Sequence, residues 1–169
     1  MEGKAKFLGH SVHPILIVFP LGLLATAVIF DVIYLIWGNA LFATVSYWMI
    51  GAGIIGGLVA APFGLIDWIA IPSGTRAKSV GLAHGIVNVF TVGVFLVSWY
   101  LRSNTPERPP MTATALAIFG LVTALVGGWL GGELVERLGI AVHPGANPDA
   151  PSSLSTDASN IRGAHPHRP

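Results

Sequence analysis

Four long apolar segments dominate this chain and limit what it can fold into. They run from about Pro14 to Trp37, over 42–71, over 80–101 and over 111–134. A helix needs about 20 apolar residues to cross a hydrocarbon core of about 30 Å, and each segment meets that length. The runs are continuous rather than alternating, which favours helices over the strands of a barrel. We therefore predict an all-α integral membrane protein with four transmembrane helices.

The composition agrees with a lipid environment. Of the 169 residues, 53% are hydrophobic and 10% are charged, whereas soluble domains carry about 25% charged residues. A net charge of +1 without a clustered basic face excludes nucleic acid as an expected partner. The absence of cysteine excludes disulfides, thiolate metal sites and iron–sulfur clusters. No nucleophile elbow, phosphate loop or zinc-protease helix is present, so we do not expect the chain to be an enzyme on its own.

Short connections and the distribution of basic residues predict the topology. Links of a few residues favour antiparallel neighbours, and hence an up-down-up-down bundle. Basic residues prefer cytoplasmic loops. Five of them lie on the side of the N-terminus and two on the opposite side: Lys4, Lys6, Arg76, Lys78 and Arg137 against Arg102 and Arg108. We predict a multi-pass protein of the cell (inner) membrane with both termini in the cytoplasm.

The chain divides into a membrane domain and a tail. Residues 1–142 hold the four spans, and residues 143–169 are rich in Pro, Ala, Ser, Asn and His. Such a segment has too few large apolar groups to offset the entropy of ordering. We predict a disordered cytoplasmic tail, which contains His165 and His167.

An internal repeat links the first and third spans. The segment His13–Gly22 aligns with His84–Gly93, and His, Ile, Val, Phe and Gly coincide at five of the ten positions. A repeat of this kind predicts two helical hairpins of the same orientation, related by a pseudo-twofold axis along the membrane normal.

The repeat also places ionisable groups. His13, Asp67, His84 and Glu133 put one such group from each span at the cytoplasmic end, and Asn88 lies one turn beyond His84 on the same helix face. Charged groups are costly in lipid and normally face the bundle interior, where they pair with one another. We expect these side chains to form a cluster inside the bundle.

These motifs carry a family resemblance. The residues GHSVHPILIVFPLG from Gly9 to Gly22, the segment 64–68 (GLIDW), His84 with Asn88, and the segment 131–134 (GGEL) resemble an uncharacterised bacterial membrane family, domain of unknown function 2231. The resemblance implies a small four-span membrane protein, sometimes joined to or near redox partners such as Rieske-type domains. The general shape is also similar to that of small diheme cytochrome b bundles.

Two kinds of cofactor site fit this pattern. In the first, a b-type haem is held between His13 and His84, with Asn88 beside it, in a flat slot left by glycines. The glycines considered for that slot are Gly81, Gly85, Gly51, Gly53, Gly56 and Gly57. In the second, a divalent metal ion is bound by His13, Asp67, His84 and Glu133, a nitrogen and oxygen set suited to iron, zinc or manganese. His143 is a candidate accessory ligand. Either site predicts a redox or accessory subunit, with other membrane-complex subunits or a second copy as partners.

Two other functions stay open. The polar groups can simply hydrogen-bond across helices, in a non-catalytic structural or assembly subunit of a membrane complex. Alternatively, Asp67, Glu133 and Asp31 can form a proton or ion path. Asp31 lies near the outer end of the first span, where we expect it to be solvated.

Overall fold

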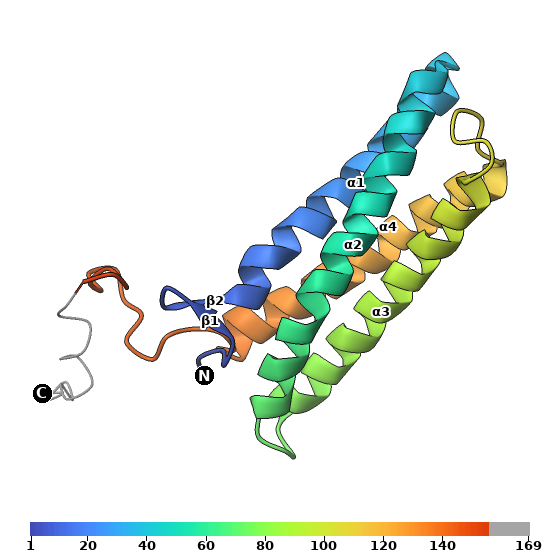
Figure 1. Ribbon diagram of the computed structural model, residues 1–169. Helices are drawn as coiled ribbons and strands as arrows, with labels where there is room; N and C mark the ends of the chain where they lie inside the picture. Colours follow the sequence, from blue (N-terminus) through green and yellow to red (C-terminus); the bar gives the residue numbers. More distant parts are fainter. Residues whose placement is uncertain (156–169) are drawn as a thin grey trace, which may run out of the picture.

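The computed structural model describes residues 1–155 and contains four long helices (Figure 1). The helices are α1 (Val12–Trp37), α2 (Ala40–Ala70), α3 (Arg76–Arg102) and α4 (Met111–Gly132), and α4 continues into a π-helical turn, η1 (Glu133–Arg137). Residues 143–155 form turns without helix or strand. The remainder of the predicted tail, with His165 and His167, lies outside the described residues.

Local sequence signals end and begin the helices. Gly38 takes the left-handed conformation (φ 69°) that terminates α1, and its N–H donates to the carbonyl of Tyr34. The side chain of Asn39 accepts the N–H of Leu41 at 3.0 Å and caps α2. The side chain of Thr75 accepts the N–H of Lys78 at 3.2 Å and caps α3. These caps satisfy backbone groups that a helix leaves unpaired at its ends.

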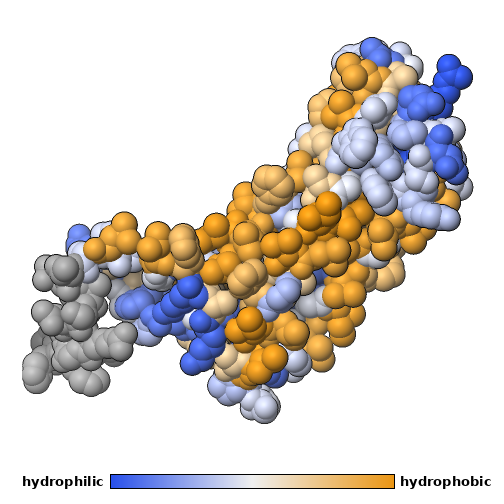
Figure 2. Space-filling model, viewed as in Figure 1, coloured by the Kyte–Doolittle hydropathy of each residue, from blue (hydrophilic) through white to orange (hydrophobic). Residues whose placement is uncertain are grey.

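All four helices have the length and hydropathy of membrane spans, which confirms the prediction of a four-span membrane protein. Apolar residues cover most of the middle of the helical body, and hydrophilic residues gather toward its ends (Figure 2). Large apolar side chains such as Phe19, Val89 and Trp129 are about two-thirds exposed, as expected of surfaces that face lipid.

A small β-hairpin precedes α1 and was not predicted. Strands β1 (Lys6–Phe7) and β2 (His10–Ser11) pair antiparallel. Leu8 and Gly9 connect them with positive φ values of 48° and 83°, which is the signature of a two-residue type I′ turn. The segment is too short and too polar for the apolar pattern to reveal it.

The four helices form two hairpins. Helix α1 packs along α2, and α3 packs along α4, far more extensively than α2 packs on α3 or α1 on α4. Both chain ends of the described region lie at the end of the bundle where α1 begins (Figure 1). The interface between the two hairpins, called the seam below, is thus less extensive than the interface between the two helices within either hairpin.

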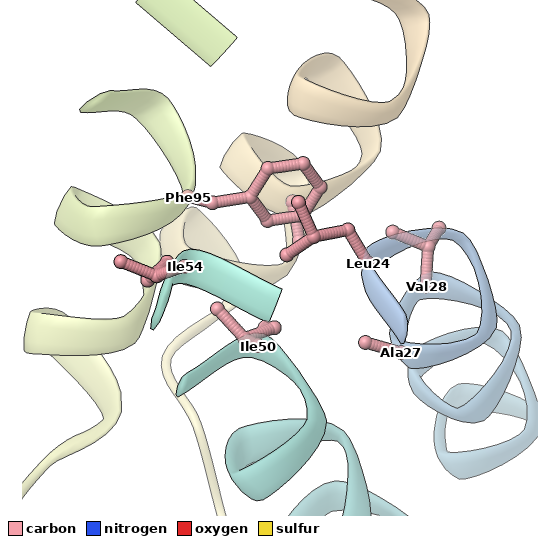
Figure 3. Packing of buried hydrophobic residues seen from close by; sticks show 7 residues of the cluster. Leu24, Ala27, Val28, Ile50, Ile54 and Phe95 are labelled. Atoms are coloured by element: carbon pink, nitrogen blue, oxygen red, sulfur yellow. The ribbon is translucent and has the colours of Figure 1, made fainter. Parts of the chain in front are cut away.

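Packing contacts repeat from one hairpin to the other. A Cβ on Gly53 of α2 would lie 2.7 Å from the side chain of Leu24, and one on Gly120 of α4 would lie 2.8 Å from Phe95. Leu24 and Phe95 are equivalent in the repeat, and both belong to the central apolar cluster (Figure 3). The glycines let each second helix approach a large side chain of the first. These matched contacts agree with the predicted repeat of two hairpins.

Equivalent residues of α1 and α3 meet across the seam at three depths. His13 lies beside His84 at one end, and Leu24 and Phe95 share the central cluster. At the other end, Asp31 pairs with Arg102, which follows it by 71 residues, the same interval that separates the two histidines. The seam is thus polar at both ends and apolar in the middle.

The pair of Asp31 and Arg102 corrects two expectations from the sequence, that Asp31 is solvated and that Arg102 is a loop charge. Both side chains are 0% exposed, and two hydrogen bonds of 2.6 Å join the guanidinium to the carboxylate. Arg102 also donates to Ser46 at 3.2 Å. Asp31 is therefore not solvated. A charge buried this deeply is tolerated only with a partner of opposite sign, and Arg102 is that partner.

We predict that Arg102→Met destabilises the protein by roughly 3–5 kcal/mol, because the carboxylate of Asp31 would stay buried without its partner. The double variant Asp31→Leu/Arg102→Met should recover most of that loss, since it removes both charges. Reversible unfolding in mixed detergent micelles measures both effects.

Arg108→Met is the matched control, because Arg108 is an exposed arginine at the same end of the bundle. Equal stability of the Arg102 and Arg108 variants would show that the buried pair does not stabilise the fold.

Candidate functional site

Two imidazole rings face each other at the end of the bundle where α1 begins. The ring centroids of His13 and His84 lie 6.3 Å apart, and the ring planes are nearly perpendicular, at 87°. One ring comes from each hairpin, so the pair bridges the seam. The structure brings together the two residues that the repeat singled out.

Each imidazole is oriented by a backbone carbonyl of the second helix in its own hairpin. Nδ1 of His13 lies 3.1 Å from the carbonyl oxygen of Ala60, and Nδ1 of His84 lies 3.0 Å from that of Gly127. A carbonyl oxygen can only accept, so each Nδ1 carries the proton and donates it. The lone pair of each neutral ring is therefore on Nε2, which is the tautomer that metal-binding histidines commonly adopt.

A glycine one turn beyond each carbonyl makes room for the ring. A Cβ on Gly64 would lie 2.9 Å from Cε1 of His13, and a Cβ on Gly131 would lie 3.2 Å from Cε1 of His84. Since any larger residue would press on the imidazole, these two glycines are a steric requirement of the paired rings. The carbonyl and the glycine occur at matching places in both hairpins.

Asn88 joins the pair on one side only. Its Nδ2 lies 3.1 Å from Nε2 of His84 and donates to the carbonyl oxygen of His84 at 2.9 Å. Because Nδ1 of His84 is the proton donor, Nε2 accepts the hydrogen bond from the amide. Within residues 1–155, Nε2 of His13 has no hydrogen-bond partner.

Asp67 lies near this end of the bundle but has another role. Its Oδ1 accepts the backbone N–H of Lys4 at 2.6 Å and that of Ala5 at 3.3 Å. The carboxylate is only 7% exposed. Asp67 therefore fixes the segment before α1 to the end of α2.

Glu133 is also held away from the histidines. Its Oε1 accepts a hydrogen bond of 2.6 Å from Arg76 at the start of α3. The interval that relates Gly64 to Gly131 makes Leu134, not Glu133, the counterpart of Asp67. One residue along a helix turns a side chain by about 100°, so Glu133 lies on a different face.

The predicted four-ligand metal site is thus not formed in the part of the chain that the structure describes. No group of three or more His, Asp or Glu side chains is suitably placed to hold a metal ion there. The predicted slot is filled as well, because Gly51, Gly53 and Gly81 lie against Trp99, Leu24 and Trp68. These glycines serve close helix packing; Gly85 alone of the slot glycines has no atom within 4 Å of its Cβ position.

His143, the candidate accessory ligand, lies outside the paired rings. Its Nε2 is 3.0 Å from Oε1 of Glu2, and its Nδ1 accepts the N–H of Gly145 at 3.0 Å. The contact joins the segment after η1 to the N-terminal segment over the same end of the bundle. His143 therefore joins the two segments that lie over this end of the bundle, and it is not part of the paired-imidazole site.

Three features of the structure were not predicted from the sequence. Arg102 was expected in a loop, although it follows Asp31 by the repeat interval. The carbonyls of Ala60 and Gly127 could not be identified, because every residue has a backbone carbonyl. Gly64 and Gly131 were noted as family motifs, but not as the contact surfaces of the imidazoles.

We predict that Gly64→Ala displaces the His13 ring and weakens its bond to the Ala60 carbonyl, at a net cost of roughly 1–3 kcal/mol. Unfolding in detergent micelles gives the stability, and the ¹⁵N chemical shifts of the His13 imidazole give the hydrogen bond. Gly85→Ala is the control, since no atom lies within 4 Å of its Cβ position. A Gly64→Ala protein with unchanged His13 shifts would contradict the steric role of this glycine.

Comparison with known proteins identifies the family. The model of the predicted membrane protein family DUF2231 matches residues 9–144, so the chain belongs to this family. Neither a search of curated proteins nor a search of solved structures found a significant match. The matched range includes all four helices and every residue of the paired-imidazole site.

Proposed function

We propose that this member of the DUF2231 family is a small redox subunit of the membrane that binds a b-type haem between His13 and His84. The observation that carries the proposal is the pair of imidazoles with both Nδ1 atoms held by carbonyls. That arrangement puts the lone pair of each ring on Nε2. Nε2 of His13 has no hydrogen-bond partner in residues 1–155, and Nε2 of His84 accepts a hydrogen bond from Asn88 that a metal would have to replace. The similarity to diheme cytochrome b bundles stays a prediction, since the family match does not test it.

The number of ligands favours haem over a bare metal ion. A bare zinc ion takes three or four protein ligands, and the described residues supply two. Haem iron already has four ring nitrogens and needs only axial ligands from the protein. His13 and His84 would supply those axial nitrogens, since their ring centroids lie 6.3 Å apart across the seam.

The position of the histidines also suits a flat group. His13 belongs to the first hairpin and His84 to the second, and the hairpins contact each other less extensively than the helices within each do. A planar ring bound by both residues would have to part the hairpins here, because Gly51, Gly53 and Gly81 already lie against side chains. When bound, haem iron supplies one-electron chemistry by changing between two oxidation states.

The chain itself holds and orients the two axial groups. The carbonyls of Ala60 and Gly127 keep both rings in the tautomer that can bind a metal. Gly64 and Gly131 define where the rings can lie. The apolar layer of Leu24 and Phe95 closes the seam on the side of the bilayer centre.

Hemin binding tests the proposal. Protein purified in mild detergent and titrated with hemin should develop a Soret band at a stoichiometry of one, with low-spin spectra of two-histidine coordination. His13→Ala and His84→Ala should each weaken hemin binding at least tenfold and lose the low-spin spectrum. His10→Ala is the control, because His10 is exposed and lies outside the pair.

Hemin binding that is absent in the wild type, or equal in all four proteins, would rule out the haem site. Histidine variants that fold and retain the same membrane partners would then favour the structural or assembly function. A proton path is the weaker alternative, because Asp31, Asp67 and Glu133 are each held by a separate partner.

We also propose that the paired imidazoles lie on the cytoplasmic side of the cell membrane. Lys4, Lys6, Arg76, Lys78 and Arg137 lie at their end of the bundle. Of the two basic residues at the other end, Arg102 is buried in an ion pair and is not a loop charge. The excess of basic loop residues at the histidine end, which the positive-inside rule uses, is therefore larger than the count from the sequence alone.

Cysteine labelling checks this orientation, since the natural chain has no cysteine. Ser103→Cys, in the loop between α3 and α4, should react with a membrane-impermeant maleimide in intact spheroplasts. Ser73→Cys, in the loop between α2 and α3, should react only after lysis. The reverse pattern of labelling would place the histidines on the outer side.

A further inference from the structure

The exposed apolar side chains outside the helices gather at one place. Among the described residues outside the helices, three large apolar side chains are more than half exposed: Phe7 at 66%, Leu8 at 61% and Leu154 at 73%. Phe7 and Leu8 form the tip of the β-hairpin that precedes α1. Ser153, the neighbour of Leu154, contacts the same hairpin, since its Oγ lies 3.2 Å from Nε2 of His10. Two segments far apart in the chain thus present apolar side chains near the start of α1.

The turn of this hairpin carries leucine at a position that disfavours it. Leu8 has a φ of 48°. Type I′ turns usually have asparagine, aspartate or glycine there, because a larger side chain is strained in the left-handed region. Such strain persists where the side chain gains from a contact outside the turn. The turn therefore indicates that the apolar side chain of Leu8 has a partner beyond the hairpin.

The hairpin is fixed at its base. The N–H of Val12 donates to the carbonyl of Ala5 at 2.9 Å, and the carboxylate of Asp67 accepts the backbone N–H groups of Lys4 and Ala5. Gly3 is buried against the same carboxylate, because a Cβ there would lie 3.1 Å from both of its oxygens. The tip is thus held at a defined place relative to α1 and α2.

That place is the level expected for lipid headgroups. A strand rises about 3.3 Å per residue, so the tip lies within about 10 Å of Val12, the first residue of α1. The headgroup layer on each side of a bilayer is about 5–8 Å thick. Figure 1 shows the hairpin beside the start of α1, with α2 and α3 extending farther along the bundle. Ile15, in the first turn of α1, is 55% exposed, so the lipid-facing surface of this helix begins next to the hairpin.

Lysines accompany the apolar tip. Lys4 and Lys6 precede Phe7 in the chain, and both are exposed. Glu2 pairs with Lys6 and balances part of this charge. A lysine stem can lie along apolar surface while its ammonium group stays among polar headgroups. An apolar tip with basic residues beside it suits the interface of a bilayer that contains anionic lipid.

We propose that this hairpin is an interfacial anchor whose tip residues, Phe7 and Leu8, insert among the headgroups of the bilayer around the bundle. Lys4 and Lys6 lie beside anionic headgroups, and Leu154 adds to the apolar contact from the segment after η1. Insertion stops at the headgroups, because the outer backbone groups of a two-stranded hairpin need polar partners that hydrocarbon lacks. The anchor needs no bound cofactor.

Single-cysteine labelling measures the depth of the tip, since the natural chain has no cysteine. Leu8→Cys with a nitroxide label, in nanodiscs of phosphatidylcholine and phosphatidylglycerol, should collide more often with oxygen, which concentrates in lipid, than with a water-soluble nickel chelate. Ser73→Cys is the control, because Ser73 lies in an exposed loop at the same end of the bundle, and it should show the opposite preference. A label at position 8 that prefers the nickel chelate would overturn the proposal and leave the exposed tip to a protein partner.

Leu8→Asn separates a lipid anchor from a purely structural turn without any label. Asparagine relieves the backbone strain at this φ, so a purely structural hairpin should become more stable and exchange its amide hydrogens more slowly. Loss of the apolar contact with lipid predicts the reverse. In nanodiscs, the amides of residues 6–11 should exchange about 3- to 10-fold faster than in the wild type. Exchange at the wild-type rate or below it would contradict the anchor.

Lys4→Gln tests the part played by anionic lipid, and it keeps the backbone N–H that Asp67 accepts. The wild-type hairpin should exchange about 2- to 5-fold more slowly in nanodiscs with phosphatidylglycerol than in phosphatidylcholine alone. Lys4→Gln should remove most of that difference. Arg108→Gln, an exposed site at the other end of the bundle, should leave it unchanged. Equal exchange of the wild type in both lipids would overturn the assignment of anionic lipid as the partner.

Discussion

Polar side chains inside a bilayer must find their partners within the protein, and this constraint organises the whole bundle. Water is absent from the hydrocarbon core, so an unpaired polar group is expensive there. The seam between the hairpins is where these partners meet: two imidazoles at one end and a bidentate ion pair at the other, with an apolar layer between them. Packing of small residues inside each hairpin brings the helices close enough for the seam to form.

The repeat explains why the same two helices supply both polar layers. A pseudo-twofold arrangement makes equivalent residues of α1 and α3 face each other. Where two identical side chains would repel, the two helices must carry different residues at the equivalent positions. Asp31 meets Arg102 for this reason, since two facing carboxylates would repel each other. Two neutral imidazoles do not repel each other, and the structure places them edge to face, with Nε2 of His84 accepting a hydrogen bond from Asn88. In the described residues, each layer leaves one nitrogen without a hydrogen-bond partner: Nε2 of His13 at one end and the buried Nε of Arg102 at the other.

Departures from the repeat are as informative as the repeat itself. The second hairpin is shorter: Gly127 follows His84 by 43 positions, whereas Ala60 follows His13 by 47. The difference is about one helical turn. Asp67 has Leu134 as its counterpart, so one hairpin end fixes the N-terminal segment and the other continues into a π-helical turn. Asn88 has Ile17 as its counterpart. Each difference gives one hairpin a role that the other lacks, at the end of the bundle where the histidines lie.

The amino-acid sequence by itself determined the fold class, the four spans and the facing of His13 and His84. Apolar runs of membrane length allow only helices, and the repeated motif requires equivalent residues to lie at equal depth. Tertiary structure decided which polar groups pair. Asp67 accepts from the backbone of Lys4, and Glu133 pairs with Arg76. A displacement of one residue turns a side chain by about 100° around the helix, and the spacing of motifs does not predict the helix face that precisely. The carbonyls that orient the imidazoles were hidden for a simpler reason: every residue has one, and only the packing of two helices selects those of Ala60 and Gly127.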